Sequence, residues 1–362
     1  MTPSSPHDPI ISLTALGWEL QPSEPETPGA RPARVMLQSR GAWHVHDGSR
    51  DAVATLSGAA RREEIAPATG DWVLVTGEAD GAWVIVSVLP RRTVVERKVA
   101  GRRSDAQVIA TNVDVVAICH PCSDINERRL EREVTAAWQS GATPVVILTK
   151  ADEAEEDPVS LMATVAAHAP GIEVLVRSAW DATGLADLSS RMEPGRTWMF
   201  FGPSGVGKST LVNALAGEEI MATHEVREDG RGRHTTTARH LLVLPNGALV
   251  IDTPGMREFG LVGEDEDALR STFADVDEVL VRGCRFADCA HGEEPGCALR
   301  EALESGRLDP ERVDAWQKLR REVAFMARRD DVRLQAEERR KWAGISKARR
   351  ALEKQARTKG KR

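Results

Sequence analysis

The chain has 362 residues, of which 41% are hydrophobic, and its 48 Lys and Arg against 55 Asp and Glu give a formal net charge of −7. This length predicts two or three domains, and no apolar run reaches the roughly 18 residues that a membrane span needs. Residues 1–30 contain no apolar core of the kind a signal peptide carries, so the sequence argues against both a membrane protein and a secreted one.

Two segments are strongly basic despite the acidic average. Residues 333–362 hold twelve Lys or Arg against three Asp or Glu, and residues 91–103 hold six against one. Such patches fit an RNA partner, although a solvated helix face and a disordered tail would have the same composition. The five cysteines form no disulfide framework, which indicates a reducing, cytosolic compartment, and three of them lie close enough together to suggest a metal site.

The N-terminal part divides into a tail and a barrel. Residues 1–30 carry many prolines and little periodicity, so we expect a flexible tail. Residues 31–97 contain short apolar runs such as Trp72–Val75 between turn signals, which predicts an all-β barrel of the OB type. Three tryptophans of this region are either core residues or platforms on which RNA bases stack: Trp43, Trp72 and Trp83.

Residues 98–268 alternate strands and helices, which is typical of an α/β domain with a mostly parallel sheet. We expect helices over 126–140 and 208–216. Strands are expected over 113–119, 143–148, 171–177, 197–201, 241–244 and 248–251. Residues 269–332 read as a mostly helical subdomain around a Cys/His cluster, and residues 333–362 as a basic tail.

A complete phosphate-binding loop follows the strand expected at 197–201. It consists of Gly202, Pro203, Ser204, Gly205, Val206, Gly207, Lys208 and Ser209, followed by Thr210. Backbone N–H groups of such a loop cradle the phosphates, its lysine reaches the β- and γ-phosphates, and its serine hydroxyl ligates Mg²⁺. The pattern predicts a nucleoside triphosphate site.

The residues after this loop suggest how the triphosphate is attacked. Asp252 ends an expected strand and fits the acidic residue that holds Mg²⁺, while the Gly255 N–H is suited to meet the γ-phosphate. Between the phosphate loop and Asp252 lies Gly230–Thr237, preceded by a polar, glycine-bearing stretch that has the composition of a switch. One of Thr235 to Thr237 should complete the Mg²⁺ shell, and we favour Thr236. Met256 stands where many GTPases have a glutamine that orients water. His234 is therefore a candidate substitute, with a solvated loop histidine as the equal alternative.

Two further elements predict guanine specificity. The first reads Thr149, Lys150, Ala151 and Asp152 and resembles the NKxD element of GTPases, with Thr149 in place of the commoner Asn. A buried Asp152 would accept two hydrogen bonds from guanine that adenine cannot donate, while the Lys150 stem would lie over the base. The second, Ser178 and Ala179, resembles the element whose backbone N–H reaches guanine O6.

These guanine elements precede the phosphate-binding loop, whereas ordinary GTPases have them after it. A circular permutation accounts for the order, because domain termini tend to be close in space and the same sheet can form. In such a chain, residues 252–261 would pass a change at the γ-phosphate directly to the Cys/His region, with no helix–strand unit between.

Four candidate metal ligands lie within fourteen residues: Cys284, Cys289, His291 and Cys297. Three thiolates and one imidazole make a closed tetrahedral site, so we expect one structural Zn²⁺ per chain, with buried free cysteines as the alternative. Beyond the cluster, four apolar residues at helical spacing are expected to pack against it: Trp316, Leu319, Val323 and Met326.

The succession of motifs resembles the ribosome small-subunit-dependent GTPase A (RsgA) family over about residues 30–330. The motifs are Gly70–Asp71, Leu89–Arg92, Thr111–Asp114, Thr149–Asp152, Gly202–Thr210, Gly232–Thr237, Asp252–Gly255, Arg257–Gly260 and Cys284–Cys297. The resemblance implies an OB barrel, a circularly permuted P-loop GTPase domain and a Cys₃His zinc subdomain.

In function, the resemblance implies GTP hydrolysis stimulated by the small ribosomal subunit and its rRNA, during late maturation of that subunit. We expect a cytoplasmic monomer that binds GTP and GDP. The alternative is a GTP-dependent RNA-binding switch or scaffold with negligible turnover, because Met256 cannot orient water. A DNA-binding zinc-finger regulator is disfavoured, since the metal-ligand spacing is not that of a C2H2 finger and a nucleotide site is present.

Overall fold

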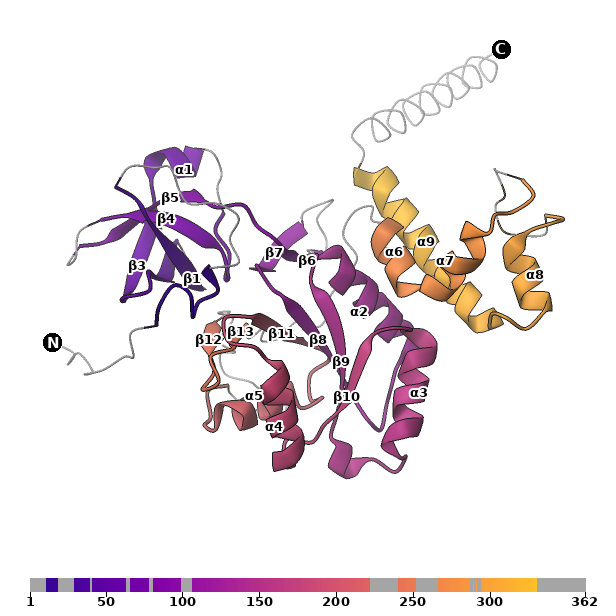
Figure 1. The fold of residues 1–362 in the computed structure, drawn as a ribbon. Coiled ribbons are helices and arrows are strands. Elements are labelled where there is room, and N and C mark those ends of the chain that lie inside the picture. The colour runs from indigo at the N-terminus through magenta and orange to yellow at the C-terminus, as the bar shows by residue number, and fades with distance from the viewer. Residues whose placement is uncertain are drawn as a thin grey trace, which may run out of the picture.

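The computed structural model describes residues 11–18, 29–39, 41–62, 66–77, 81–98, 106–221, 240–251, 266–286, 289, 291 and 294–330. Figure 1 shows a barrel, a central sheet flanked by helices, and a group of helices on the far side of that sheet. Over the described residues, no helix combines the length and apolar character that crossing a lipid bilayer requires.

The N-terminal barrel is closed, as expected for an OB-type fold. Its strands are β1 (Arg31–Ser39), β2 (Ala42–His46), β3 (Asp51–Leu56), β4 (Trp72–Thr76) and β5 (Trp83–Val88), with helix α1 (Gly58–Arg62) after β3. They follow the order β1-β2-β3-β5-β4, and antiparallel pairing of β1 with β4 closes the ring. The β3–β5 pair is parallel, which the short helix between β3 and β4 makes possible.

The three barrel tryptophans are core residues. Trp72 and Trp83 are almost wholly buried, and Trp43 is buried with its indole N–H donating to the Pro67 carbonyl at 2.8 Å. The Arg31 guanidinium covers the Trp83 ring at 4.1 Å from its centroid. None of these three rings is exposed for stacking on an RNA base, so that alternative is wrong for them.

A hairpin and a buried seam join the barrel to the central sheet. Strands β6 (Val94–Lys98) and β7 (Ala106–Thr111) pair antiparallel, so the chain around residue 98, where we expected a domain boundary, belongs to one hairpin. Gly70 has a φ of +93°, and a Cβ there would lie 2.2 Å from the Thr111 carbonyl oxygen. Only glycine therefore allows this close approach of the two backbones.

The neighbouring motif residues complete the seam. The buried Asp71 carboxylate pairs with both arms of Arg91, at 2.8 and 2.7 Å. Asn112 has a left-handed φ of 53°, donates to the Gly70 carbonyl at 3.0 Å and accepts from the Arg92 N–H at 3.0 Å. The motifs at 70–71, 89–92 and 111–114 thus hold the barrel against the sheet.

The central sheet has six strands in the order β10-β9-β8-β11-β13-β12. Their bounds are β8 (Val115–Pro121), β9 (Thr143–Thr149), β10 (Glu173–Val176), β11 (Thr197–Phe201), β12 (Leu241–Val243) and β13 (Leu249–Ile251). The pairs are parallel except β12 with β13, which confirms the mostly parallel sheet.

Helices cover both faces of this sheet (Figure 1). They are α2 (Glu127–Gln139), α3 (Pro158–His168), α4 (Ala182–Arg191) and α5 (Lys208–Ala216). Alternate residues of one strand enter different cores. In β8, Val116 and Ile118 join Leu130 of α2, whereas Ala117 packs in a second core with Leu188 of α4. This alternation is expected for a strand that is buried on both sides.

The C-terminal helices are α6 (Glu266–Thr272), α7 (Ala274–Val281), α8 (Ala298–Glu304) and α9 (Pro310–Asp330). Trp316, Leu319 and Val323 are buried in the core that also contains α2, and the side chain of Met326 lies outside the described residues. The Trp316 ring meets the His291 ring edge-on at 5.8 Å, so the stripe does pack against the Cys/His region.

Candidate nucleotide and metal sites

The phosphate-binding loop occupies the turn between β11 and α5. A Cβ at Gly202 would lie 2.3 Å from the Cys119 carbonyl oxygen, and Gly205 and Gly207 have φ values of +83° and +98°. These glycines let the loop curl tightly into the N-terminus of α5, an end that favours anions. The Lys208 ammonium folds back over the loop and donates to the carbonyls of Gly202 and Pro203 at 2.8 and 2.7 Å.

Thr149 ties this loop to the predicted guanine element. It ends β9, and its Oγ1 lies 2.5 Å from the Val206 carbonyl oxygen and 3.1 Å from that of His120. A threonine hydroxyl has one proton, so it donates to one of these carbonyls at a time, whereas the commoner asparagine could donate two. Thr149 therefore links the guanine element to the phosphate loop with one hydrogen-bond donor, where an asparagine would have two.

The second predicted guanine element lies next to the first. Strands β9 and β10 are parallel neighbours, so their carboxyl ends carry both elements to one edge of the sheet. The Ser178 hydroxyl donates to the Asp152 carboxylate at 2.5 Å, and the Ala151 N–H donates to the Arg177 carbonyl at 3.2 Å. Asp152 is exposed, contrary to the buried carboxylate expected from the motif, because the short helix at Ala151–Glu153 sets it at the mouth of the site.

One cavity of about 200 Å³ joins these elements. Six of its lining residues come from the motifs recognised in the sequence: Thr149, Lys150, Asp152, Ala179, Gly207 and Thr210. Four were not anticipated: Glu153, Arg177, Trp180 and Leu211. Trp180 and Glu153 could have been predicted as lining residues because they directly follow the two motifs. Leu211 could not, because it lines the cavity only through the way in which α5 packs.

Ser204 and Gly205 are exposed at the tip of the phosphate loop, and Ser209 is half-buried in the first turn of α5. Four predicted residues lie outside the described residues: His234, Thr236, Asp252 and Gly255. The strand that leads to Asp252 is described. Ile251, its last residue, pairs with Met199 of β11, so β13 ends beside the strand that leads into the phosphate loop.

The Cys/His cluster has the geometry of a metal site. The ligand atoms of Cys284, Cys289, His291 and Cys297 all lie within 4.8 Å of one another. His291 Nδ1 is 3.5 Å from the Cys284 sulfur and 3.8 Å from the Cys297 sulfur. Tetrahedral Zn²⁺ with bonds of about 2.0–2.3 Å separates such ligands by roughly 3.5–3.8 Å. These four residues could hold one metal ion.

Local backbone contacts bring the four ligands together. His291 adopts a left-handed φ of 63°, and the Gln317 side chain donates to its carbonyl at 3.3 Å. The Arg285 N–H donates to the Gly296 carbonyl at 2.9 Å, which closes the loop between Cys284 and Cys297. Burial, with the nearby charge of Arg320 adding to it, lowers the pKa of His291 and favours the neutral imidazole that metals bind.

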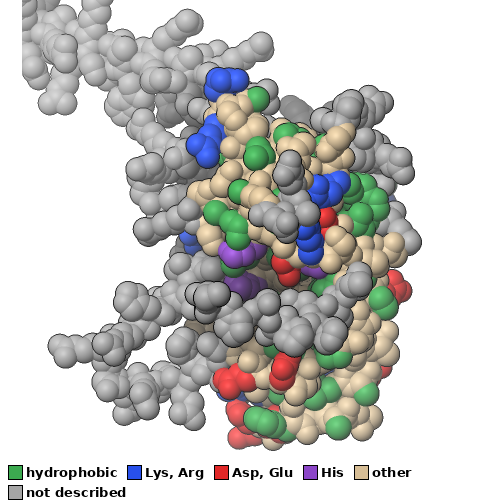
Figure 2. Space-filling view, turned by 90° about the vertical axis from the view of Figure 1, so that its left-hand side faces the viewer, with side chains coloured by type: hydrophobic (Ala, Val, Ile, Leu, Met, Phe, Trp, Pro, Cys, Tyr) green, Lys and Arg blue, Asp and Glu red, His purple; other side chains and the backbone are tan. Residues whose placement is uncertain are grey.

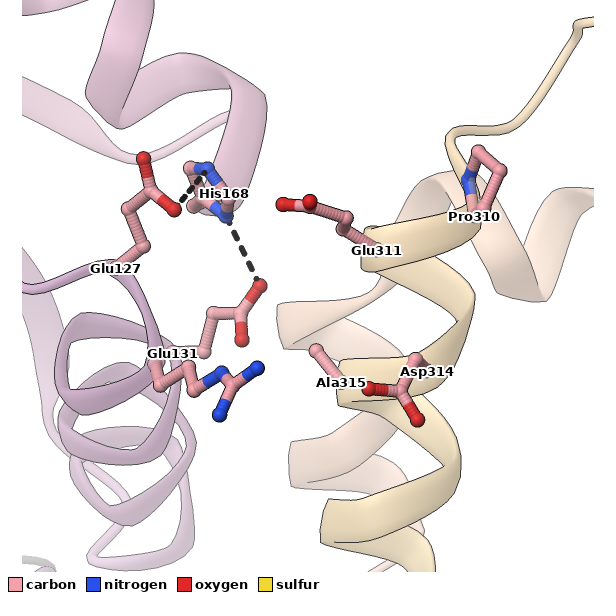
Figure 3. A pocket seen from close by; sticks show the side chains of 8 residues that line it. Glu127, Glu131, His168, Pro310, Glu311, Asp314 and Ala315 are labelled. Atoms are coloured by element: carbon pink, nitrogen blue, oxygen red, sulfur yellow. Dashed lines mark hydrogen bonds and ion pairs between the residues drawn. The ribbon is translucent and has the colours of Figure 1, made fainter.

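A second cavity, of about 290 Å³, lies between α2, α3 and α9 (Figure 3). His168 there bridges Glu127 at 3.3 Å and Glu131 at 3.2 Å, and its hydrogen bond with Glu131 raises the pKa of the imidazole. Glu131 also pairs with the buried Arg312 at 3.0 Å. No sequence motif points to this cavity, and the Glu131–Arg312 pair beside it joins α2 to α9.

The sheet order and the joined elements define the class of protein, a P-loop GTPase fold in circularly permuted order. A model of the RsgA GTPase family matches residues 88–262. The chain is 42% identical over 321 residues to small ribosomal subunit biogenesis GTPase RsgA 1 of Oceanobacillus iheyensis, covering 87% of this chain and 91% of that protein. It is 43% identical over 360 residues to the RsgA of Xanthomonas axonopodis pv. citri, covering 95% and 97%.

The chain therefore belongs to the RsgA GTPase family. Its fold is also similar to that of solved structures, two of which follow. YjeQ from Thermotoga maritima matches with a TM-score of 0.63 and 24% identity, covering 82% of this chain and 99% of that one. YloQ, described as a circularly permuted GTPase, matches with a TM-score of 0.60 and 24% identity, covering 84% and 98%.

Proposed function

We propose that this protein hydrolyses GTP to GDP and phosphate and acts in the biogenesis of the small ribosomal subunit, which stimulates the hydrolysis. The observation that carries the proposal is that one cavity is lined both by Lys150, Asp152 and Ala179 and by Gly207 and Thr210. Elements for guanine and for phosphate meet there in a chain whose relatives are named for this role.

Each motif at or next to this cavity has one task in this proposal. The Asp152 carboxylate accepts from guanine N1–H and the 2-amino group, and the Ser178 hydroxyl orients it. The Ala179 N–H reaches guanine O6. The amides of residues 202–210 cradle the phosphates, while Lys208 exchanges its loop carbonyls for the β- and γ-phosphate oxygens.

Two metals belong to the proposal. Ser209, Thr236 and Asp252 would hold Mg²⁺, which neutralises phosphate charge when bound, and the Gly255 N–H would meet the γ-phosphate. One Zn²⁺ per chain would be held by Cys284, Cys289, His291 and Cys297, whose spacing fits tetrahedral coordination. With all four positions taken by protein, this ion is structural.

The barrel is the proposed contact for rRNA in the cytoplasm, where the protein would act as a monomer. Its exposed or half-exposed arginines include Arg50, Arg61 and Arg62, and basic side chains gather over the upper part of Figure 2, where the barrel lies. Leu37 of β1 forms a β-bridge with His240, which lies three residues after Thr237 at the end of the predicted switch. RNA bound to the barrel could therefore bias the switch through this bridge.

The deciding experiment measures GTP turnover with and without purified small subunits. Turnover should be slow alone and rise strongly with subunits, since completing another GTPase site in trans is worth ~10³–10⁵ in rate. Lys208→Ala should abolish both rates while leaving the circular dichroism spectrum unchanged. Nucleotide binding with no turnover under either condition would support the RNA-binding scaffold instead.

The role of His234 is tested in the same assay. If its imidazole orients water on the subunit, His234→Ala should change basal turnover little and remove the stimulated rate. Subunit binding with a non-hydrolysable GTP analogue should persist and should weaken as salt rises. Stimulation that survives in this variant would assign the water to another group.

A further inference from the structure

Trp180 is far more exposed to solvent than the other described tryptophans. Its side chain is 78% exposed, whereas the other described tryptophans are buried or half-buried. It also borders the cavity lined by Lys150, Asp152 and Gly207. A large aromatic side chain thus stands at the mouth of the pocket that the function above assigns to a purine base.

The backbone of Trp180 is held in place by the guanine element itself. Its N–H donates to the Ser178 hydroxyl oxygen at 3.1 Å, and that hydroxyl donates in turn to Asp152. The next residue, Asp181, donates its N–H to the Ser178 carbonyl at 3.3 Å and caps α4 by accepting from Thr183 and Gly184 at 3.0 Å. The backbone that carries the indole is therefore fixed relative to the Asp152 carboxylate.

We propose that Trp180 is a nucleotide-binding residue whose indole stacks on the guanine ring. This inference rests on the proposed function and adds a contact to the base that no sequence motif supplies. Stacking uses the π-face, which every base has, while hydrogen bonds at the base edge choose between bases. Trp180 contributes affinity, and Asp152 contributes the choice of guanine.

The binding test uses the full chain with Trp180→Ala and Trp180→Phe. Calorimetry should show affinity for GDP and for xanthosine diphosphate weakened by the same factor in Trp180→Ala, on the order of tenfold for a lost stacked base. Trp180→Phe should retain most of the affinity. Val159→Ala, at a residue 76% exposed on α3, is the matched control for removing an exposed apolar side chain and should bind like wild type.

Tripolyphosphate, which has no base, separates stacking from damage to the pocket. It should compete with GDP equally well in wild type and in Trp180→Ala. A parallel loss of tripolyphosphate affinity would overturn the stacking role, as would unchanged GDP affinity in Trp180→Ala while wild type binds GDP. Failure of wild type to bind GDP would overturn the proposed function as well, so the two failures are distinguishable.

Fluorescence gives a second readout. The chain has nine tryptophans, and a base stacked on one of them should quench part of the emission. Saturating GDP should quench wild type and Trp138→Phe, which changes a half-buried tryptophan on α2, but not Trp180→Phe. Equal quenching in Trp180→Phe and wild type would contradict the proposal.

Discussion

The hydroxyl of Thr149 carries a contact that usually belongs to an amide. It lies within hydrogen-bonding distance of the Val206 carbonyl in the phosphate loop and the His120 carbonyl at the end of β8. All three residues are buried, so a carbonyl that loses this donor has no water to replace it. Thr149 thus couples the guanine element to the phosphate loop through one proton.

Thr149→Val keeps the shape of the side chain and removes that proton. We expect the free energy of unfolding to fall by about 1–3 kcal/mol, the cost of leaving a buried acceptor without a partner. Urea denaturation of the nucleotide-free protein measures it. Thr149→Ser retains the hydroxyl and should lose less, so a valine variant as stable as the serine variant would show that the contact contributes nothing.

Asp152 presents an exposed carboxylate that the Ser178 hydroxyl orients. Asp152→Asn places an amide donor opposite the guanine donors, and hydrogen bonds to charged groups are the strong ones. Affinity for GDP should fall on the order of 10–100-fold, and preference should move toward xanthosine diphosphate, whose 2-oxo group accepts a hydrogen bond. Competition binding measures both.

Glu153 supplies the control for that prediction. Its carboxylate lines the same cavity and is also exposed, but it does not stand at the guanine position of the motif. Glu153→Gln removes the same charge and should leave the ratio of guanosine to xanthosine affinities unchanged. The assignment of Asp152 fails if both variants change that ratio equally.

Among the elements, those with local end signals were predictable from the sequence. Strand β11 and helix α5 have the bounds expected, because Gly202 ends one and Gly217, with a φ of +73°, ends the other. Helix α2 begins and ends one residue inside the expected range 126–140, and the Asn126 side chain caps its start by accepting from the Arg129 N–H at 3.0 Å. In such cases the residues that terminate the element are next to it in the chain.

Elements whose pairing depends on residues far away in the sequence were harder to predict from the sequence. The pairing of β1 with β4 joins residues about forty positions apart, and the β6–β7 hairpin crosses the position where composition suggested a boundary. The cavity likewise gathers Arg177 and Leu211 only after three strands align their carboxyl ends. The spacing of a motif predicts the residues of that motif, but it does not predict the other side chains that the fold brings next to them.

The four candidate ligands between α7 and α8 are the residues of the proposed zinc site. Wild type purified without chelator should contain one zinc per chain, and Cys297→Ser should lose it, because a hydroxyl does not replace a thiolate ligand. Elemental analysis counts the metal. Cys122→Ser, at a buried cysteine outside the cluster, should retain it. A zinc-free wild type, or a Cys297→Ser variant that keeps its zinc, would contradict the site.

At the scale of the whole molecule, two buried arginines join the three parts. Arg34 of the barrel donates to the Gly70 carbonyl at 3.1 Å, to the Asn112 carbonyl at 3.2 Å and to Thr197 Oγ1 at 3.0 Å, at the start of β11. Burial lowers the pKa of this guanidinium to about 10, so it is still charged at neutral pH. The barrel is thus bonded to the strand that leads into the phosphate loop.

Arg312 plays the same role between the central sheet domain and the C-terminal helices. It lies on α9 and pairs with Glu131 of α2 and Asp275 of α7, each at 3.0 Å. It also donates to the Thr272 and His168 carbonyls at 2.7 and 2.6 Å. The acidic cavity of Figure 3 lies directly beside this network. A single side chain therefore satisfies acceptors from three helices and from the end of α3.

Arg312→Met should loosen the C-terminal helices while the nucleotide site remains folded. The substitution leaves Glu131 with His168 as its remaining partner and two carbonyls without their cationic donor, and breaking a buried ion pair on one side costs up to about 3–5 kcal/mol. Amide hydrogen exchange measures this locally. Protection should fall in α9 and remain in α5, which packs in a separate core. Lys318→Met, which removes an exposed i,i+4 pair with Asp314, should change protection little. Unchanged exchange in α9 of Arg312→Met would mean that apolar packing alone holds this junction.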